Sequence, residues 1–593
     1  VLMSPEEISI IKSRIEAKHQ GDNKQLEVIF SPDKRLLVEA PAGYGKTHTM
    51  VSRIAYLIAI GQIPVPKRLL ALTFSVNAAY KIKKDVSKNI PELLDGFDKQ
   101  INIKDKTYIS NYHGFCRSVL KKYGHILHPA LSKLDTLQSV DDSRSDNIMR
   151  TFKNISINDA DVLSNYNSAV REIKGTYLRE NINRYNSVVI AEILQKEAIP
   201  FNAIITLTIK LFQEYPSILS FYQNYYTTIL VDEFQDTNLL SYWLLNYLIS
   251  EKSNVLFLGD SLQRIYGFIG AVPNLLSRAQ SYFKLKLISL DKNYRFASNE
   301  NMLQLDKIIR QNAVTPFQNP SALSSKVEFN IYEDQVKEAL EVVIKSQEIQ
   351  RQYPTSKVAI LAKQRGPNIE HIIKTFDHNK ISFFYGLFTD DDPEYLQFNR
   401  KCLYEFIEFL KINTKVTKKL GRKHIDKIRE IYVDKDSPVI KALLELLEIF
   451  WSRLFMDYSF LSNEDKINLI KDTFEHNGIK QYMEFLDTRI IISTVHAAKG
   501  LEWDYVILPD MEKDSFPNWF GLCSKCKCGA DCNFVINNEI EKSFLEELSV
   551  YYVAVTRAKK QVYFSASNTQ LTKNGTYEKN YSCFMRLPGI EFV

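Results

Sequence analysis

The sequence has few cysteines, no long apolar run and little net charge. Its 593 residues include seven cysteines and carry a formal net charge of +6. The longest apolar runs, such as Ile54–Ile60 and Ala203–Ile209, are far shorter than the roughly 20 residues that cross a membrane. The first residues lack the charged-then-apolar layout of a signal peptide. We therefore expect a cytoplasmic protein with no membrane partner, and the small charge leaves nucleic-acid binding open.

The composition is that of a globular protein, with 45% hydrophobic and 25% charged residues. Short apolar runs that end in polar or glycine-rich turns predict buried strands, and long helical patterns separate them. Alternating strands and helices indicate parallel α/β sheets with both faces covered. The strands are predicted at Leu36–Val38, Leu69–Leu72, Ile229–Val231, Val255–Leu258, Lys357–Leu361, Ile490–Ser493, Val506–Leu508 and Val562–Phe564.

Two stretches, 121–224 and 396–484, break this alternation and are mainly helical in pattern. The chain is also too long for one ordinary core. We therefore predict an α/β fold with two parallel-sheet domains, each interrupted by a mainly helical insertion. The first domain is formed by residues 1–120 plus 225–290, and the second by 291–395 plus 485–593.

A strand, a glycine-containing loop and a helix start follow one another from Leu36 to Thr47. Gly43 and Gly45 allow backbone N–H groups to turn toward phosphate oxygens. Lys46 can reach the β- and γ-phosphates, and the Thr47 hydroxyl can ligate Mg²⁺. The first glycine of the usual G-x-x-x-x-G-K-T/S pattern is here Ala40. The alternative interpretation is a strand–turn–helix unit with a surface lysine.

A second motif places carboxylates at the end of an apolar strand, in Ile229–Thr237. Ligands of parallel α/β sheets bind at this end of the strands. Asp232 can hold Mg²⁺ through water, and Glu233 can polarise the attacking water of a phosphoryl transfer. Taken alone, the motif is equally compatible with an acidic surface turn.

The string Val231–Asn238 (VDEFQDTN) resembles the acidic motif of UvrD/Rep-type superfamily 1 helicases. Other motifs similar to those of the family follow in order along nearly the whole chain. They lie at Asn23–Gln25, Leu72–Ala79, Tyr112–Phe115, Leu258–Phe268, Asn293–Arg295, Thr494–Trp503 and Tyr552–Lys559. The resemblance implies two RecA-like motor domains and an ATP-dependent, 3′–5′ DNA helicase or translocase, as in DNA repair.

The resemblance also implies residue roles. Gln25 would contact adenine, Gln263 would sense the γ-phosphate, and Glu502 would contact the ribose. The implied catalytic residues are Lys46, Glu233, Gln263, Arg295 and Arg557, and the implied nucleotide-binding residues are Gln25, Ala42, Gly43, Gly45, Lys46, Thr47, His48, Asp232, Tyr294 and Glu502. ATP and Mg²⁺, held by Thr47 and Asp232, are the expected cofactors.

Arg295 and Arg557 lie far from the phosphate loop in sequence. An arginine neutralises transition-state charge only if folding brings it to the γ-phosphate. We therefore expect ATP to bridge the two motor domains, which would supply a two-state element for stepping. For either arginine alone, a surface salt bridge is the simpler explanation.

A protein that binds single-stranded nucleic acid needs aromatic side chains on which the bases stack and a positively charged groove for the backbone. The predicted nucleic-acid contacts are Thr73, Phe74, Asn77, His113, Tyr266, Phe268 and His496, with Trp503 as a weaker candidate because an aromatic there is usually packed. The expected partners are single-stranded and junction DNA. The second insertion carries a basic stretch that could hold duplex backbone or be a solvated helix, namely Lys415, Lys418, Lys419, Arg422, Lys423, Lys427 and Arg429.

Two positions depart from the family pattern. Ile269 stands where members of the family usually have an arginine that supports DNA and nucleotide contacts. Arg264 is a candidate to replace it. His48 stands where an arginine often covers the adenine. The second insertion is also short, which makes translocation a firmer prediction than strong unwinding.

Four of the seven cysteines lie within ten residues, in an insertion at 521–533. Cys523, Cys526, Cys528 and Cys532 follow a C-x-x-C-x-C-x-x-x-C pattern that can wrap a tetrahedral Zn²⁺. Thiols without metal and an iron–sulfur cluster are the alternatives. Cys116, Cys402 and Cys583 are predicted to be packing residues.

Two other functions compete with the helicase. The chain could be a nucleotide-gated subunit of a nuclease-containing complex, as in anti-phage operons of the Gabija type, where short UvrD-like chains stand beside an OLD-family nuclease. It could also be a degenerate structural module, although the presence of Lys46, Glu233, Arg295 and Arg557 argues against that.

Overall fold

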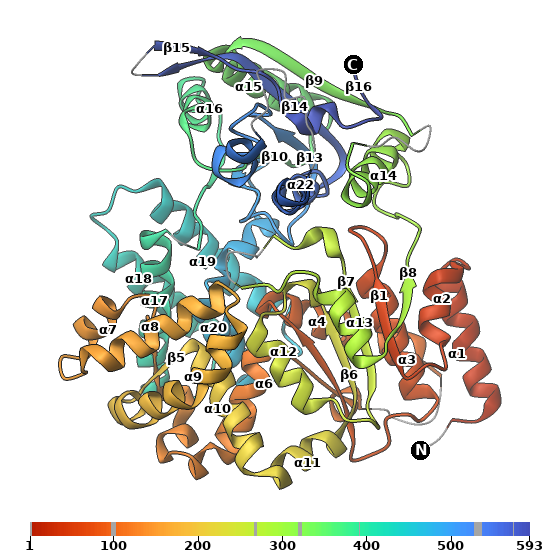
Figure 1. The fold of residues 1–593 in the computed structure, drawn as a ribbon, viewed down its shortest axis with the longest axis vertical. Coiled ribbons are helices and arrows are strands. Elements are labelled where there is room, and N and C mark those ends of the chain that lie inside the picture. Colours follow the sequence, from red (N-terminus) through yellow and green to blue (C-terminus); the bar gives the residue numbers. More distant parts are fainter. Residues whose placement is uncertain are drawn as a thin grey trace. The chain divides into compact units, whose positions relative to one another are not determined.

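The computed structural model describes residues 3–96, 102–265, 270–317, 323–390, 392–526, 537–572 and 575–593. The chain forms two compact units, Val1–Lys292 and Asn293–Val593, each with its own central sheet (Figure 1). The two α/β parallel sheets are those expected of two motor domains, so the predicted fold class is confirmed.

Six parallel strands form the sheet of the first unit, in the order β3-β2-β6-β7-β1-β8. The strands are β1 (Arg35–Glu39), β2 (Arg68–Thr73), β3 (Thr107–Asn111), β6 (Tyr226–Asp232), β7 (Asn254–Gly259) and β8 (Lys286–Ser289). The helices are α1 (Pro5–Lys18), α2 (Asn23–Phe30), α3 (Lys46–Ala59), α4 (Val76–Leu93), α5 (Ile103–Lys106), α6 (Tyr112–Tyr123), α12 (Leu239–Leu248) and α13 (Leu275–Phe283), besides those of the insertion.

Consecutive residues of β1 point to opposite faces of this sheet. Leu36 and Val38 join a core with α1, α2, α3 and α4, whereas Leu37 joins a second core with α6 and α12. All three residues are at most 1% exposed. Both faces of the sheet are therefore buried, as its near-continuous apolar strands require.

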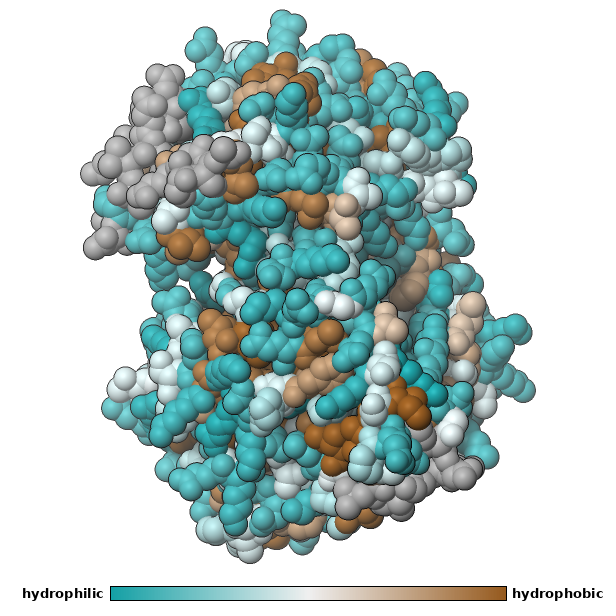
Figure 2. Space-filling model, turned by 90° about the vertical axis from the view of Figure 1, so that its right-hand side faces the viewer, coloured by the Kyte–Doolittle hydropathy of each residue, from teal (hydrophilic) through white to brown (hydrophobic). Residues whose placement is uncertain are grey.

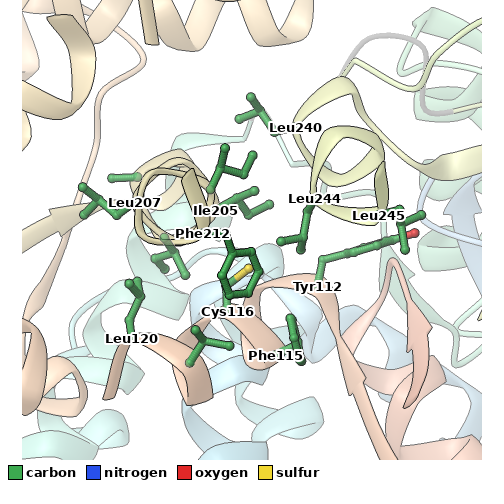
Figure 3. Close-up of a cluster of buried hydrophobic side chains, with 14 of the residues drawn as sticks. Tyr112, Phe115, Cys116, Leu120, Ile205, Leu207, Phe212, Leu240, Leu244 and Leu245 are labelled. Carbon is green, nitrogen blue, oxygen red and sulfur yellow. The ribbon is translucent and has the colours of Figure 1, made fainter. Parts of the chain in front are cut away.

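The insertion of the first unit packs on the second of these cores. It contains α7 (Ser145–Thr151), α8 (Ile157–Arg171), α9 (Gly175–Val188), α10 (Phe201–Glu214), α11 (Pro216–Tyr225) and a short parallel pair, β4 (Gln138–Val140) with β5 (Ala198–Pro200). Figure 3 shows Ile205 and Phe212 of α10 facing side chains of α6 and α12. The insertion thus shares a core with the sheet.

The sheet of the second unit runs in the order β11-β12-β10-β13-β14-β9-β16, with β15 paired to β14. Only the β14–β15 pairing is antiparallel among the described strands. The strands are β9 (Ser325–Asp334), β10 (Val358–Ala362), β11 (Phe384–Gly386), β12 (Ile490–Thr494), β13 (Trp503–Leu508), β14 (Ala558–Thr572), β15 (Gly575–Glu578) and β16 (Ile590–Phe592).

Helices surround this second sheet and form its insertion. The helices that accompany the sheet are α14 (Glu300–Val314), α15 (Gln335–Gln352), α16 (Pro367–His378), α21 (Ser524–Cys526) and α22 (Asn538–Val555). The insertion comprises α17 (Pro393–Ile412), α18 (Lys418–Ile431), α19 (Pro438–Met456) and α20 (Asn463–Glu475). In its core, His424 Nε2 donates to Cys402 O at 2.8 Å, and Trp451 Nε1 donates to His424 Nδ1 at 3.0 Å.

Each of the eight predicted strands overlaps an observed strand, although the Lys357–Leu361 prediction begins one residue before β10 and β14 extends far beyond Val562–Phe564. Cys116, Cys402 and Cys583 are buried, as predicted. Within the described ranges, no helix has the length and apolarity needed to span a membrane. The face in Figure 2 is mostly hydrophilic, with hydrophobic side chains in small separate patches. The boundaries proposed between motor domains and insertions stay a prediction.

Candidate functional site

The phosphate loop connects β1 to α3 in the first unit. Gly43 and Gly45 have φ of 83° and 78°, the left-handed conformation that favours glycine. A Cβ on Gly45 would lie 2.5 Å from Nε2 of Gln25, so a side chain there would collide with the buried amide. Gln25 Nε2 donates to Tyr44 O at 3.1 Å, which ties α2 to the loop. These contacts fix the loop at the N-terminus of α3, where an anion is favoured.

Lys46 contacts the two carboxylates that follow β6. Its Nζ lies 3.5 Å from Asp232 Oδ1 and forms a shorter ion pair with Glu233. Burial alone would lower the pKa of Lys46, but the charges of Asp232 and Glu233 raise it above its ordinary value. Burial raises the pKa of Asp232, and the Lys46 charge opposes this shift. The structure thus brings together the lysine and the two acids predicted from separate motifs.

A hydrogen-bonded chain orients the acidic turn. Glu233 has φ of 52°, which is uncommon for a residue with a Cβ. Gln235 Nε2 donates to Glu233 Oε2 at 2.6 Å, while Gln235 Oε1 accepts from the backbone N–H of Asp260 at 3.1 Å. Gln263 Nε2 in turn donates to Asp260 Oδ2 at 2.8 Å. This chain links Glu233 with Gln263 across the ends of β6 and β7.

Gln235 and Asp260 were not assigned roles from the sequence, although both lie within quoted motifs. Gly259 also belongs to this arrangement, because a Cβ there would lie 2.8 Å from Gln235 Oε1. The sequence did offer one signal for Gln235 and Asp260, because both are polar residues that follow the ends of apolar strands. The pairing between them depends on which strands are neighbours, which the sequence pattern did not reveal.

The predicted adenine region contains a stacked pair of histidines. The rings of His19 and His48 lie 4.2 Å apart at 22°. His19 Nδ1 contacts Gln25 Oε1, and its Nε2 lies 2.8 Å from Ser52 Oγ. Burial and the charges of His19 and Lys18 lower the pKa of His48 to about 4, so this ring is neutral at pH 7. Gln25 is 1% exposed, and its role as a base contact stays a prediction.

The predicted DNA contacts of the first unit have different environments. Thr73 ends β2, where it lies in register with Asp232 of β6, and it is fully buried. His113 is 7% exposed and stacks on Phe201 at 3.6 Å between ring centroids. Phe74 and Asn77 are half-buried. Tyr266, Phe268 and Ile269 lie outside the described residues. The DNA-contact roles of all these residues remain predictions.

In the second unit, three distant motifs meet around two arginines. Arg295 forms an ion pair with Glu502 and donates to Thr556 O. Arg557 is 3% exposed, and it donates from Nε to Val553 O at 2.9 Å and from Nη1 to Leu501 O at 3.0 Å. The motifs around 295, 502 and 557 therefore form one cluster. Tyr294 is half-buried in the chain segment that carries Arg295.

His496 and Trp503 lie on either side of Glu502 and Leu501 in the sequence. Burial, with the charges of Lys363, Lys480 and Lys499, lowers the pKa of His496 to about 4. A neutral imidazole among three ammonium groups can contact phosphate or sugar without adding charge. Trp503 is 1% exposed and belongs to the packed interior, which is the alternative that the sequence favoured for it.

Two of the four clustered cysteines are described. Cys523 Sγ accepts from Asp514 N–H at 3.4 Å and lies 3.4 Å from Pro517 O, while Cys526 ends α21. Both thiols are half-buried. Cys528 and Cys532 lie outside the described residues.

Each unit thus carries its own set of groups suited to phosphate chemistry. The first offers an N-terminal helix end, a lysine, a hydroxyl and two carboxylates at the ends of parallel strands. The second offers two arginines beside a carboxylate. Cationic groups and Mg²⁺-binding carboxylates of this kind are those that phosphoryl transfer requires.

Comparisons with known proteins agree with these two sets. A family model described as the UvrD/REP helicase N-terminal domain matches residues 22–284. A second model, the UvrD-like helicase C-terminal domain, matches residues 394–569. The first match includes Lys46, Asp232 and Glu233, and the second includes Glu502 and Arg557, whereas Tyr294 and Arg295 lie between the two matches.

Curated relatives extend over nearly the whole chain. The ATP-dependent DNA helicase PcrA of Staphylococcus epidermidis is 26% identical over 648 residues, covering 93% of this chain and 84% of the relative. The protein of the same name from Staphylococcus aureus is 24% identical over 649 residues, covering 93% and 83%.

Proposed function

The chain belongs to the UvrD/Rep-type superfamily 1 helicases, and on that basis we propose that it hydrolyses ATP to move 3′ to 5′ along single-stranded DNA and separate duplex DNA. The observation that carries this proposal is the contact of Lys46 with Asp232 and Glu233 at the ends of parallel strands. A buried lysine held by two acids beside a glycine loop has the chemistry of a nucleotide triphosphatase.

The proposed roles follow from these contacts. Lys46 exchanges its carboxylate partners for the β- and γ-phosphates of ATP. Glu233, oriented by Gln235 and no longer paired with Lys46, accepts a proton from the attacking water. Gln263, held by Asp260, reports the state of the γ-phosphate to the segment that follows it.

The residues present fit Mg²⁺. Thr47 supplies a hydroxyl at the start of α3, and the carboxylate of Asp232 lies 3.5 Å from Lys46 Nζ at the same strand end. Oxygen ligands of this kind are those that Mg²⁺ prefers. When bound, Mg²⁺ supplies neutralisation of phosphate charge.

Arg295 and Arg557 are proposed to neutralise charge that develops on the transferred phosphoryl group. Arg295 must then exchange Glu502 for phosphate, and Glu502 becomes available to a ribose hydroxyl. Arg557 keeps hydrogen bonds to Val553 O and Leu501 O, which orient its guanidinium. ATP would thereby join the two sets of groups, and hydrolysis would release them.

The test is ATP turnover by the full chain with and without single-stranded DNA. We expect DNA to stimulate turnover, and no stimulation would overturn the motor assignment. Glu233→Gln should abolish turnover while ATP still binds, because the amide keeps the shape but cannot accept the proton. Turnover retained in this variant would refute the role of Glu233. Strand displacement on substrates with 3′ or 5′ tails tests the polarity.

Helix α18 is proposed to contact duplex DNA at a junction. Its apolar face, which includes Leu420 and Ile428, is buried. Lys427 pairs with Glu430 and Arg429 with Glu448, so these two charges are partly satisfied within the protein. The remaining basic residues of α18 are exposed, namely Lys418, Lys419, Arg422 and Lys423, and so is Lys415, which precedes the helix. Exposed cations of this density support binding to phosphate backbone.

For the cysteine cluster we propose a structural Zn²⁺ bound by Cys523, Cys526, Cys528 and Cys532. The spacing and the half-burial of the first two thiols support it. Metal analysis of the purified full chain should find one zinc per chain, and Cys523→Ser should lose it. A protein that contains no zinc, or an iron content instead, would contradict this assignment.

The alternative proposal is a nucleotide-gated ATPase subunit of a nuclease-containing, anti-phage complex. The short second insertion, α17 to α20, is the feature that supports it. Copurification of a nuclease such as an OLD-family protein, together with ATPase activity without strand displacement, would favour this alternative over the helicase. DNA unwinding by the isolated chain would favour the helicase.

A further inference from the structure

Three carboxylates of the second unit meet away from the arginine cluster. Glu338 lies in α15, and Asp510 and Glu512 follow β13. One oxygen from each lies within 4.8 Å of the oxygens of the other two. Glu338 and Glu512 are fully buried, and Asp510 is half-buried. None of these residues belongs to the motifs of the motor.

The cluster occupies the carboxyl edge of the parallel sheet. Asp510 comes two residues after β13, Glu338 lies in the first turns of the helix that follows β9, and Asn368 begins the helix that follows β10. This edge is where parallel α/β sheets bind ligands. Four separate chain segments therefore converge on one buried point, the fourth being β14 through Ser565 and Ser567.

Hydrogen bonds show that the two glutamates are acceptors. Glu338 Oε1 accepts from Ser565 Oγ at 2.6 Å and from Asp510 N–H at 3.2 Å. Glu512 Oε1 accepts from the N–H of Ser567 at 2.5 Å and from its Oγ at 2.7 Å. Such donors favour the ionised carboxylate. Burial nevertheless raises the pKa of Glu338, and so does the negative charge of Glu512 and Asp510 beside it.

Positive charge at the cluster falls short of this negative charge. Lys579 Nζ donates to Glu512 Oε2 at 2.8 Å and contributes one positive charge. Three carboxylates against one ammonium group leave an excess of about two negative charges when all are ionised. Buried charges without compensation destabilise a folded protein. A divalent cation would remove this imbalance.

Asn368 gives a second, independent indication. It is 1% exposed, and its side chain points into the cluster, where Nδ2 donates to Glu338 Oε2 and to Asp510 Oδ1, both at 2.8 Å. Its Oδ1 is buried and has no hydrogen-bond partner. Rotating the amide by a half turn exchanges the two atoms and presents the oxygen to the same point. There it would serve as a neutral ligand.

We propose that Glu338, Asp510 and Glu512, with the amide oxygen of Asn368, bind one hard divalent cation, Ca²⁺ or Mg²⁺. Carboxylate and amide oxygens are the ligands of such ions. Two oxygens on opposite sides of Ca²⁺ are about 4.6–5.2 Å apart, so a set within 4.8 Å surrounds this ion with little movement. The absence of sulfur and imidazole among these ligands disfavours zinc and copper.

The cation would fasten strands that also hold the arginines. Leu501 and Glu502, just before β13, contact Arg557 and Arg295, and Arg557 itself precedes β14. Asp510 follows β13, and Ser565 lies within β14. A cation bound here would join the other end of β13 to α15 and α16, next to the middle of β14 at Ser565. We expect it to stabilise the second unit.

The test measures Ca²⁺ and Mg²⁺ binding to the full chain by calorimetry, after chelation and without nucleotide. Wild-type protein should bind one of these ions at one site and unfold at a higher temperature in its presence. Asp510→Asn should weaken binding by about tenfold or more, because it removes a charged ligand. Glu338→Gln should do the same if that variant folds.

Glu341→Gln is the matched control, since Glu341 lies one turn from Glu338 on α15 but pairs with Lys337 at 2.8 Å. It should bind the cation like wild type. Asp232→Asn controls for binding in the first unit. No binding or stabilisation by either ion at millimolar concentration would overturn the proposal. Normal binding by Asp510→Asn would overturn it as well, and the carboxyl groups would then share protons instead.

Discussion

Lys46 of the first unit and Arg557 of the second are both cations with little exposure to solvent, but they are held by opposite kinds of partner. Lys46 lies against the charges of Asp232 and Glu233, whereas Arg557 donates to the neutral carbonyls of Val553 and Leu501. Ion pairs can be exchanged for phosphate, because one anion replaces another. Carbonyls cannot bind phosphate, so they fix a guanidinium whose charge stays available.

This difference indicates that the two units respond differently to nucleotide binding. In the first, charged groups change partners when nucleotide binds, and a polar chain from Glu233 to Gln263 registers the exchange. In the second, neutral carbonyls hold the charge of Arg557 in place, although Arg295 is paired with Glu502.

The largest effect is expected for Arg557→Ala. Loss of an arginine finger lowers kcat by about 10³–10⁵-fold. ATP binding should change little, because the groups of the first unit remain. Steady-state turnover and equilibrium binding of a fluorescent ATP analogue measure the two quantities. Lys559→Ala, an exposed neighbour, is the control and should turn over normally. Equal losses in the two variants would remove Arg557 from catalysis.

The second unit's use of neutral partners extends to His424, which is fully buried between Cys402 O and Trp451 Nε1. Burial lowers its pKa from 6.5 to about 4. The unfolded chain therefore binds a proton that the folded chain excludes between these pH values. The stabilisation is complete above pH 6.5 and is lost as pH falls toward 4, by about 3 kcal/mol.

Denaturant unfolding monitored between pH 7 and 4 measures this loss. His424→Gln keeps a donor and an acceptor but cannot titrate, so its free energy of unfolding should depend less steeply on pH. An unchanged slope would show that other groups cause the acid sensitivity. His371→Gln, at a half-buried position in α16, is the matched substitution that controls for replacing a histidine elsewhere in the second unit.

A smaller effect is expected for Gln235→Ala in the first unit. Gln235 orients Glu233, and a misplaced base reduces kcat by about 10²-fold. As a positioning residue it should alter kcat and leave KM for ATP unchanged. Gln235→Glu adds a like charge beside Glu233 and should not restore activity. A change confined to KM would mean that Gln235 acts in binding, and the proposed chain to Gln263 would lose its support.

The smallest effect concerns α18, where exposed and paired cations lie on one helix. Arg422→Gln should weaken binding to junction DNA and reduce the slope of log affinity against log salt by about 1. Arg429→Gln is the control, since Arg429 already pairs with Glu448. Fluorescence anisotropy across a salt series gives both slopes. Identical slopes for wild type and Arg422→Gln would make α18 a solvated helix.

The sequence predicted most of the strands that position the motor residues, because β1, β2, β6 and β7 are continuous apolar runs. It missed β8, whose Lys286–Ser289 is largely exposed at the sheet edge and therefore lacks that pattern. It also missed β3, where buried and half-buried residues alternate and Ile109 is the only aliphatic residue. Edge and alternating strands depend on pairing with neighbours, which local hydrophobicity does not encode.

The site residues also divide into those that a local motif predicts and those that only the pairing of strands brings together. Lys46, Asp232 and Glu233 were identified because each follows a strand within a compact motif, and the structure brings them into contact. The link from Gln235 to Asp260 was not predicted, because it depends on β6 and β7 being adjacent. The carboxylates of Glu338 and Glu512 were also missed. Their wide separation along the chain leaves no local signal, and only the sheet brings them together.

The alternating faces of β1 limit how this chain can change in length during evolution. Removing one residue from β1 would reverse the face of the sheet to which each following side chain points. Leu37 would then enter the core that Leu36 and Val38 now occupy, and residues on either side would no longer match their cores. The same deletion would displace the glycine loop by one position relative to Asp232. Insertions and deletions among homologues should therefore accumulate in the connecting segments, while the number of residues between Leu36 and Lys46 stays constant.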